Sequence, residues 1–95
     1  MKTFLIIYSK TNNLTDLQAR INSLGDVFFF MENHCLLSVV NDDTTAKDVY
    51  ERLGDNSQLN SIYVTLINTM VERGYWGTMP SDFWDWLANH PSSVV

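Results

Sequence analysis

The stretch Val27-Phe28-Phe29-Phe30-Met31-Glu32-Asn33-His34-Cys35-Leu36-Leu37-Ser38-Val39-Val40 decides the fold that we expect for this chain of 95 residues. Two runs rich in aromatic, β-branched and other apolar residues, 27–31 and 35–40, flank the polar stretch 32–34. Such runs favour β-strands, and a short polar stretch with Asn between them is typical of a tight turn. The sequence therefore predicts a β-hairpin near the middle of the chain.

Two further apolar runs, Phe4 to Tyr8 and Ile62 to Ile67, have the length and composition of strands. An amphipathic helix is expected between each of them and the hairpin, within 14–24 and 46–53. The resulting order of strand, helix, strand, strand, helix, strand is the split βαβ arrangement of ferredoxin-like α+β domains, over 2–68. Because βαβ crossovers are right-handed, the first and third strands should lie at the centre of a four-stranded antiparallel sheet.

Residues with special roles mark the expected helix boundaries. We expect Asn13 to cap the first helix and Gly25 to end it in the left-handed conformation, whereas Gly54 ends the second helix. An aromatic tail and a C-terminal helix occupy 69–95. Ser81 is the expected cap of that last helix.

The composition is that of a small globular protein. Apolar residues make up 45% of the chain, which is too many for a disordered polypeptide, and the length suits one domain, 1–95. No apolar run approaches the roughly 20 residues that span a bilayer. The single cysteine, Cys35, favours a reducing compartment. We therefore expect a cytoplasmic protein that does not enter a membrane.

The charge balance bears on the class of partner. Eleven Asp and Glu against six Lys and Arg give a net charge of −5, and the basic residues are scattered along the chain. Nucleic-acid binding requires clustered Lys and Arg that displace counterions from phosphates. The sequence therefore argues against a nucleic-acid partner.

The predicted strands are apolar on both faces, whereas two helices cover only one face of a sheet. The second face must be covered by the C-terminal helix, by a second copy of the chain, or by both. We expect a homodimer, because two-fold dimers are the commonest assembly. The candidate dimer or protein-partner surface consists of the aromatic residues Phe28, Phe30, Tyr75, Trp76, Trp84 and Trp86.

Four features occur together along the chain: the run Phe4-Leu5-Ile6-Ile7-Tyr8, the stretch Phe28-Phe29-Phe30-Met31-Glu32-Asn33, Leu59 before the last strand, and the tail Gly74-Tyr75-Trp76-Gly77 with Trp86-Leu87. With these features the chain resembles the SinR-family proteins of bacteria. That family is similar to VapD and to the small CRISPR-associated ribonuclease-like subunit of the spacer-acquisition complex. The resemblance implies a role linked to defence or mobile elements.

The resemblance also implies a position for catalysis, at the end of the first strand. In members with nuclease activity a Tyr-Asp pair stands there, and the two Asp residues of a dimer hold a divalent metal. Tyr8 matches this pair, but Ser9 stands where the group has Asp. Because a serine hydroxyl cannot replace a charged ligand of a hard cation, the departure argues against metal-dependent cleavage of nucleic acid.

A different candidate site consists of Ser9, Glu32 and His34, since the end of the first strand lies beside the start of the third in this topology. These are nucleophile, orienter and base types, but polar residues at strand ends are the more common reason for such a set. The spacing of Glu32, His34 and Cys35 matches no zinc pattern, and Cys35 suits a small apolar filler in a buried strand. We assign no catalytic residue, no metal ligand and no cofactor.

Three functions remain as hypotheses. The leading one is a non-catalytic homodimeric interaction module. The alternatives are a nuclease-like or nucleic-acid-binding protein of similar fold, and a small-molecule-binding regulatory domain. A basic groove would favour the first alternative, whereas a pocket lined by apolar side chains and a few polar groups would favour the second.

Overall fold

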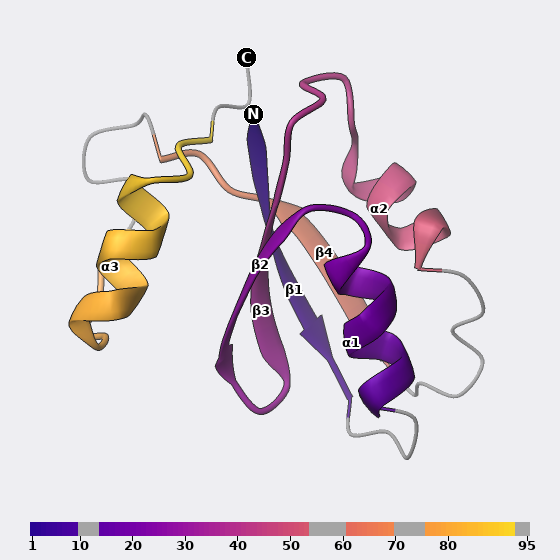
Figure 1. Cartoon of the computed structure of the whole chain (residues 1–95), viewed down its shortest axis with the longest axis horizontal. Coiled ribbons are helices and arrows are strands. Elements are labelled where there is room, and N and C mark those ends of the chain that lie inside the picture. Colours follow the sequence, from indigo (N-terminus) through magenta and orange to yellow (C-terminus); the bar gives the residue numbers. More distant parts are fainter. Residues whose placement is uncertain (10–13, 54–60, 70–75, 93–95) are drawn as a thin grey trace.

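The computed structural model describes residues 1–9, 14–53, 61–69 and 76–92 (Figure 1). Within these ranges the chain forms four strands and three helices. In chain order the elements are β1 (Lys2–Tyr8), α1 (Leu14–Asn22), β2 (Asp26–Met31), β3 (His34–Val39), α2 (Ala46–Arg52), β4 (Ile62–Leu66) and α3 (Ser81–Ala88). The βαββαβα order confirms the predicted α+β class and the additional C-terminal helix.

The strands pair in the order β2-β3-β1-β4, and every neighbouring pair is antiparallel. The first and third strands therefore lie at the centre of the sheet, as predicted. Ile6 of β1, for example, lies opposite Cys35 of β3 and Val64 of β4. The predicted hairpin is also confirmed, with His34 as the first residue of β3 rather than part of the turn.

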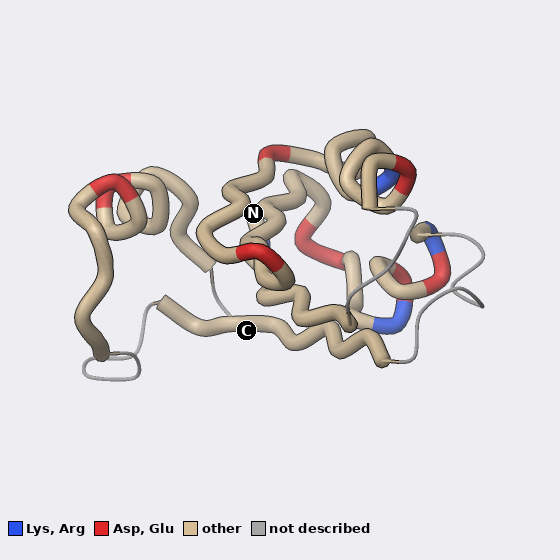
Figure 2. The backbone as a smooth tube through the Cα atoms, turned by 90° about the horizontal axis from the view of Figure 1, so that it is seen from below, with Lys and Arg blue, Asp and Glu red and all other residues tan. Residues whose placement is uncertain are grey.

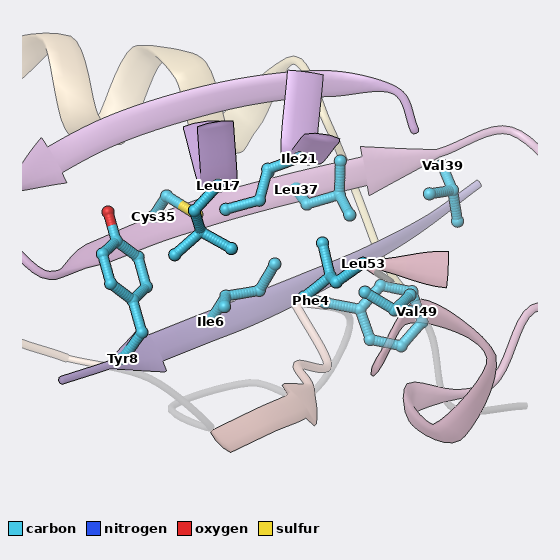
Figure 3. Close-up of a cluster of buried hydrophobic side chains, with 10 residues drawn as sticks. All are labelled: Phe4, Ile6, Tyr8, Leu17, Ile21, Cys35, Leu37, Val39, Val49 and Leu53. Carbon is cyan, nitrogen blue, oxygen red and sulfur yellow. The ribbon is translucent and has the colours of Figure 1, made fainter. Parts of the chain in front are cut away.

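The sheet lies between two layers of helices. Figure 1 shows α1 and α2 on one side of the sheet and α3 on the other side. The main core fills the space between the sheet and the first two helices (Figure 3). Its buried members are Phe4, Ile6, Tyr8, Leu17, Ile21, Cys35, Leu37, Val39, Val49 and Leu53. Because side chains alternate along a strand, the residues between these on β1 and β3 point to the opposite face.

The boundaries of the last two helices have different causes. Thr45 caps α2 through a capping box, in which its hydroxyl accepts the Asp48 N–H at 3.1 Å and the Asp48 carboxylate accepts the Thr45 N–H at 2.9 Å. The prediction that Ser81 caps α3 is wrong, because Ser81 is already the first helical residue. Pro80 holds the cap position with an extended backbone and makes no side-chain cap hydrogen bond.

Gly25 ends the loop after α1, but not for the reason predicted from the sequence. Its backbone does not adopt the left-handed conformation. A Cβ atom at this position would instead overlap the backbone carbonyl oxygen of Ser38 on the neighbouring strand. Glycine is therefore required by a close backbone approach. The other expected end residues, Asn13 and Gly54, lie outside the described residues, as do Leu59 and Tyr75.

The segment that follows α3 returns to the sheet and is held by buried hydrogen bonds. The hydroxyl of Ser92, which is 1% exposed, accepts the backbone N–H of Thr3 at 2.8 Å and donates to the Ile67 carbonyl at 2.7 Å. The Thr3 hydroxyl donates to the His90 carbonyl at 2.9 Å. These bonds fix the C-terminal end of α3 beside the start of β1 and the end of β4.

Candidate functional site

The second face of the sheet is apolar along its centre, as the strand patterns predicted. Leu5 of β1 lies opposite Leu36 of β3, which in turn lies opposite Phe28 of β2. Two residues after Leu5 on the same face of β1, Ile7 lies opposite Tyr63 of β4. All of these positions alternate with residues of the main core, so their side chains point away from α1 and α2.

α3 covers the β2 side of this face through aromatic contacts. The Phe83 ring packs in T-shaped arrangements with Phe28 and Phe30, with centroid distances of 6.3 and 5.1 Å and interplanar angles of 64° and 73°. Trp86 also packs on Phe28, with a centroid distance of 5.9 Å. Edge-to-face pairs of this kind add to the free energy of burying the rings. The C-terminal helix therefore packs on the sheet of its own chain.

His90 anchors the C-terminal end of α3. Its Nδ1 atom lies 2.7 Å from the Trp86 carbonyl oxygen, and because a carbonyl only accepts, Nδ1 carries the hydrogen. Its Nε2 atom lies 3.2 Å from the carboxylate of Asp26 on β2. The imidazole is also stacked on the Trp86 ring, with centroids 3.9 Å apart. These contacts hold the helix along the edge of the sheet.

Between α3 and the β1–β4 side of the sheet, the chain leaves an apolar groove with a volume of about 770 Å³. Its sheet side comes from β1, β2, β3 and the end of β4, and its other side from α3 and the segment before it. The lining residues are Leu5, Phe30, Leu36, Leu66, Ile67, Asn68, Thr69, Trp76, Gly77, Thr78, Met79, Phe83, Trp84 and Leu87. No charged residue is among these lining residues.

The aromatic residues predicted to form a dimer or partner surface do not share one environment in the structure. Phe28, Phe30 and Trp86 take part in the packing of α3 on β2. Trp84 lines the groove and packs edge-on against its neighbour Phe83 on the helix. By contrast, the Trp76 side chain is 92% exposed at the margin of the groove.

The charged side chains of α3 lie on its solvent face, away from the groove. Asp82 and Asp85 are exposed on α3, the helix that forms one side of the groove. Figure 2 shows Asp and Glu alone on α3, whereas Lys and Arg gather at the other end of the molecule around α1 and α2. With 3.6 residues per turn, both carboxylates lie on the side of α3 opposite Phe83, Trp84 and Leu87, so the described lining of the groove is uncharged.

The structure places Ser9, Glu32 and His34 at one end of the sheet. The Ser9 hydroxyl accepts the backbone N–H of Ser61 at 3.1 Å, which joins the end of β1 to the start of β4. The Glu32 backbone carbonyl accepts the Tyr8 hydroxyl at 3.4 Å, whereas the Glu32 side chain is exposed. The His34 ring faces Phe30, with centroids 6.0 Å apart.

Cys35 lies in the main core, as predicted for a small apolar filler. Its side chain is fully buried, and burial raises the pKa of its thiol to about 12. Because the thiolate is the reactive form of cysteine, this burial suppresses its reactivity. Within the part of the chain that the structure describes, no group of three His, Cys, Asp or Glu side chains is placed to hold a metal ion.

The groove and the buried role of Ser92 were not predicted from the sequence. The apolar character of both strand faces was a usable signal for the groove, since it indicated a second apolar surface. The groove itself, however, depends on the position of α3 over β2, which leaves the β1–β4 side open. The role of Ser92 had no sequence signal, because a serine near the C-terminus is most often exposed.

Comparison with known proteins finds no matching family model, no matching curated protein and no matching solved structure. Among the described residues, no helix is both long enough and apolar enough to cross a membrane.

Proposed function

We propose that the protein is a non-catalytic, homodimeric interaction module on a ferredoxin-like scaffold. The strand order β2-β3-β1-β4 with antiparallel pairing supports the ferredoxin-like assignment. The sequence resemblance to SinR-family proteins supports a setting in defence or mobile elements, with Ser9 in place of the metal-binding Asp of the nuclease members. The presence of Ser9 instead of the metal-binding Asp is consistent with a protein that binds a partner and does not catalyse a reaction.

The observation that carries the proposal is the open part of the second sheet face. α3 packs on β2, at one edge of the sheet, whereas β4 forms the other edge and pairs only with β1 among the described strands. Tyr63 of β4 is 61% exposed, and Ile7 and Thr65 beside it are only half-buried. An apolar face next to an unpaired edge strand favours association with another chain.

A second copy is the occupant that this surface fits best. No charged residue occurs in β4, so two copies can approach there without repulsion between like charges. A two-fold axis beside β4 would bring Tyr63 of each copy against the partner's sheet face, and aromatic residues are enriched in such contacts.

Sedimentation velocity over a range of protein concentrations tests the proposal. The expected result is a species of twice the 10.9 kDa chain mass, which Tyr63→Asp converts to a folded monomer because it buries a charge in the contact. Val40→Asp is the matched control, since Val40 is 84% exposed at the end of β3 and should leave the dimer intact. A monomer at all concentrations for the unmodified chain would overturn the proposal.

A further inference from the structure

We propose that the apolar groove beneath α3 binds a neutral small molecule that has a largely apolar body and a single hydroxyl or carbonyl group. The apolar body would lie between Leu5 and Leu36 of the sheet and Leu87 of α3. The polar group would lie at the solvent-exposed margin, beside the Thr78 hydroxyl. This site goes beyond the proposed dimer and does not depend on it.

The two sides of the groove are held in place by contacts that do not involve a ligand. The packing of Phe83 and Trp86 on Phe28 fixes α3 over β2. The bond from the Thr3 N–H to the buried Ser92 hydroxyl fixes the segment after α3 beside β1. Closure of the groove would require these contacts to shift, so the groove is preformed, as small-molecule sites usually are.

The apolar side chains at the groove are only partly covered by the protein. Half-buried members of the lining include Leu5, Phe30, Ile67 and Trp84. A bound apolar molecule would remove their remaining surface from water, which is favourable. The volume of the groove, about 770 Å³, lies within the roughly 300–1,000 Å³ of typical ligand sites, so one small molecule is sufficient to cover them.

The uncharged lining selects a neutral ligand. A charged group that leaves water is costly to bury unless it is paired and hydrogen-bonded, and the described lining offers no carboxylate, ammonium, guanidinium or imidazole group. Asp82 and Asp85 lie on the side of α3 opposite Leu87, so they do not provide a partner for a cation inside the groove. Both a cation and an anion would therefore bind less tightly than a neutral molecule of the same shape.

Few side chains of the groove can form a hydrogen bond with a ligand. Those of the described lining are Asn68, Thr69 and Thr78, together with the Trp indoles. Asn68 already has an interaction partner, and the Thr69 hydroxyl donates to the Ser92 carbonyl at 3.2 Å and accepts the Ser92 N–H at 2.8 Å. The exposed Thr78 hydroxyl makes no hydrogen bond with the other described residues, so it can donate to or accept from one polar group of the ligand.

The same scarcity of polar groups argues against a polypeptide in the groove. An extended segment would bring a backbone N–H and C=O with almost every residue, and these groups need partners when they are buried. A second copy of the chain fits better on the surface proposed above for the dimer, where Tyr63 of β4 does not belong to the groove lining. The dimer and the ligand therefore use different parts of the second sheet face.

Three naphthalene derivatives with the same carbon frame test the inference. At pH 7, 1-naphthalenemethanol is neutral, 1-naphthalenemethylammonium is a cation and 1-naphthoate is an anion. Each is titrated into the isotope-labelled full chain, and binding is followed by two-dimensional NMR. We expect saturable binding of the alcohol, with one molecule per chain, and an affinity at least about tenfold above that of either ion. Absence of saturable binding, or a smaller preference over either ion, would refute the proposal.

Two measurements locate the bound alcohol. Leu5→Trp fills the groove and should weaken binding by about tenfold or more, whereas Val40→Trp adds the same ring at an exposed position and should not. In the unmodified chain, nuclear Overhauser effects should join the naphthalene protons to the methyl groups of Leu5 and Leu87. This second measurement decides if circular dichroism shows that Leu5→Trp fails to fold. Unchanged affinity in the folded variant, or absence of these effects, would place the alcohol elsewhere and overturn the assignment.

Removal of one hydroxyl tests the polar contact. Thr78→Val keeps the shape of the exposed side chain and should weaken binding of the alcohol by about threefold or more, whereas binding of 1-methylnaphthalene, which lacks the hydroxyl, should not change. Thr15→Val is the matched control, because Thr15 is exposed on α1, on the other side of the sheet. Equal affinity of the alcohol for the Thr78→Val and Thr15→Val variants would contradict the position of the polar group.

Sedimentation velocity with and without saturating alcohol separates this inference from the proposed dimer. The mass of the species should be the same in both conditions, and Tyr63→Asp should retain binding of the alcohol. A monomer that still binds the alcohol would overturn the dimer alone. Dissociation of a dimer by the alcohol would show that a second copy occupies the groove, and would overturn this inference.

Discussion

The backbone N–H of Thr3 donates to the hydroxyl of Ser92 at a distance of 2.8 Å, although 89 positions separate the two residues in the chain. This hydroxyl also donates to the Ile67 carbonyl at 2.7 Å. One small side chain thus joins the first strand, the end of the last strand and the segment that follows α3. The position of α3 over the sheet depends in part on this junction.

Replacing Ser92 should destabilise the fold more than its small size suggests. Ser92→Ala leaves the buried N–H of Thr3 without its acceptor, which should lower the free energy of unfolding by about 1–3 kcal/mol. Urea denaturation followed by circular dichroism measures this loss. Ser23→Ala is the control, because the exposed Ser23 hydroxyl donates to the Arg20 carbonyl at the surface and its removal should cost within about 0.5 kcal/mol. Equal losses for the two variants would contradict a special role for Ser92.

Gly25 should tolerate no side chain, whereas Gly77 should tolerate one. Gly25→Ala places a Cβ on the Ser38 carbonyl oxygen of β3, so the backbone of one strand must shift. We expect a loss of about 1–3 kcal/mol in the free energy of unfolding, measured by urea denaturation. A Cβ on Gly77 meets nothing within 4 Å, and Gly77→Ala should change stability by within about 0.5 kcal/mol. The reverse order of the two effects would show that the close approach of Gly25 to β3 is incorrect.

The capping box of α2 should make stability depend on acid pH. The Thr45 backbone N–H, together with the Thr45 hydroxyl, lowers the pKa of the Asp48 carboxyl below its ordinary value of 3.8. Because the folded-state pKa is the lower one, the stabilisation is present above pH 3.8 and is lost as the pH falls through the folded-state pKa. Asp48→Asn should therefore lower the melting temperature near pH 6, and the difference from the unmodified chain should shrink below pH 3.

A second variant separates the two parts of the capping box. Thr45→Ala removes the hydroxyl but retains the backbone N–H, which is the larger cause of the pKa shift of Asp48. This variant should lose about 1 kcal/mol from its cap and still show a pH-dependent contribution from Asp48. If the Asp48→Asn difference is the same at pH 6 and below pH 3, the carboxylate does not act through its charge.

Cys35 should resist alkylation in the folded protein. A thiol with a pKa of about 12 is ionised in roughly one molecule in ten thousand at pH 8, and its side chain is fully buried. Iodoacetamide at pH 8 should therefore leave the native chain unmodified and label it fully in urea, as read by mass spectrometry. Rapid labelling of the native chain would contradict the buried position of Cys35.

The strand pattern predicted more of the fold than the individual end residues did. The apolar runs around Phe4 and Phe28 were long enough to identify strands, and the right-handed crossover rule then placed β1 and β3 at the centre. The cap at Ser81 and the left-handed Gly25 were predicted wrongly. Ser81 could cap the helix or begin it, and Pro80 occupies the cap position, so Ser81 begins it. Gly25 could adopt the left-handed conformation or make room for a neighbouring backbone, and the Ser38 carbonyl, distant in sequence, requires the second role.

The sequence indicated an excess of apolar surface on the sheet, but it did not predict the groove itself. The alternation of apolar residues in the predicted strands indicated a second apolar face, but it does not tell how much of that face α3 covers. The rings of Phe83 and Trp86 pack on Phe28 of β2, and this choice of edge leaves the β1–β4 side open.

The sequence alone determined the order of the elements, the apolar character of both sheet faces and the acidic charge, because these properties follow from local patterns and composition. The tertiary structure decided where α3 lies, why Gly25 must be glycine and that Ser92 is buried. Each of these depends on contacts between residues far apart in the chain, such as Thr3 with Ser92 and Asp26 with His90. The groove exists because such long-range contacts fix the helix at one edge of the sheet.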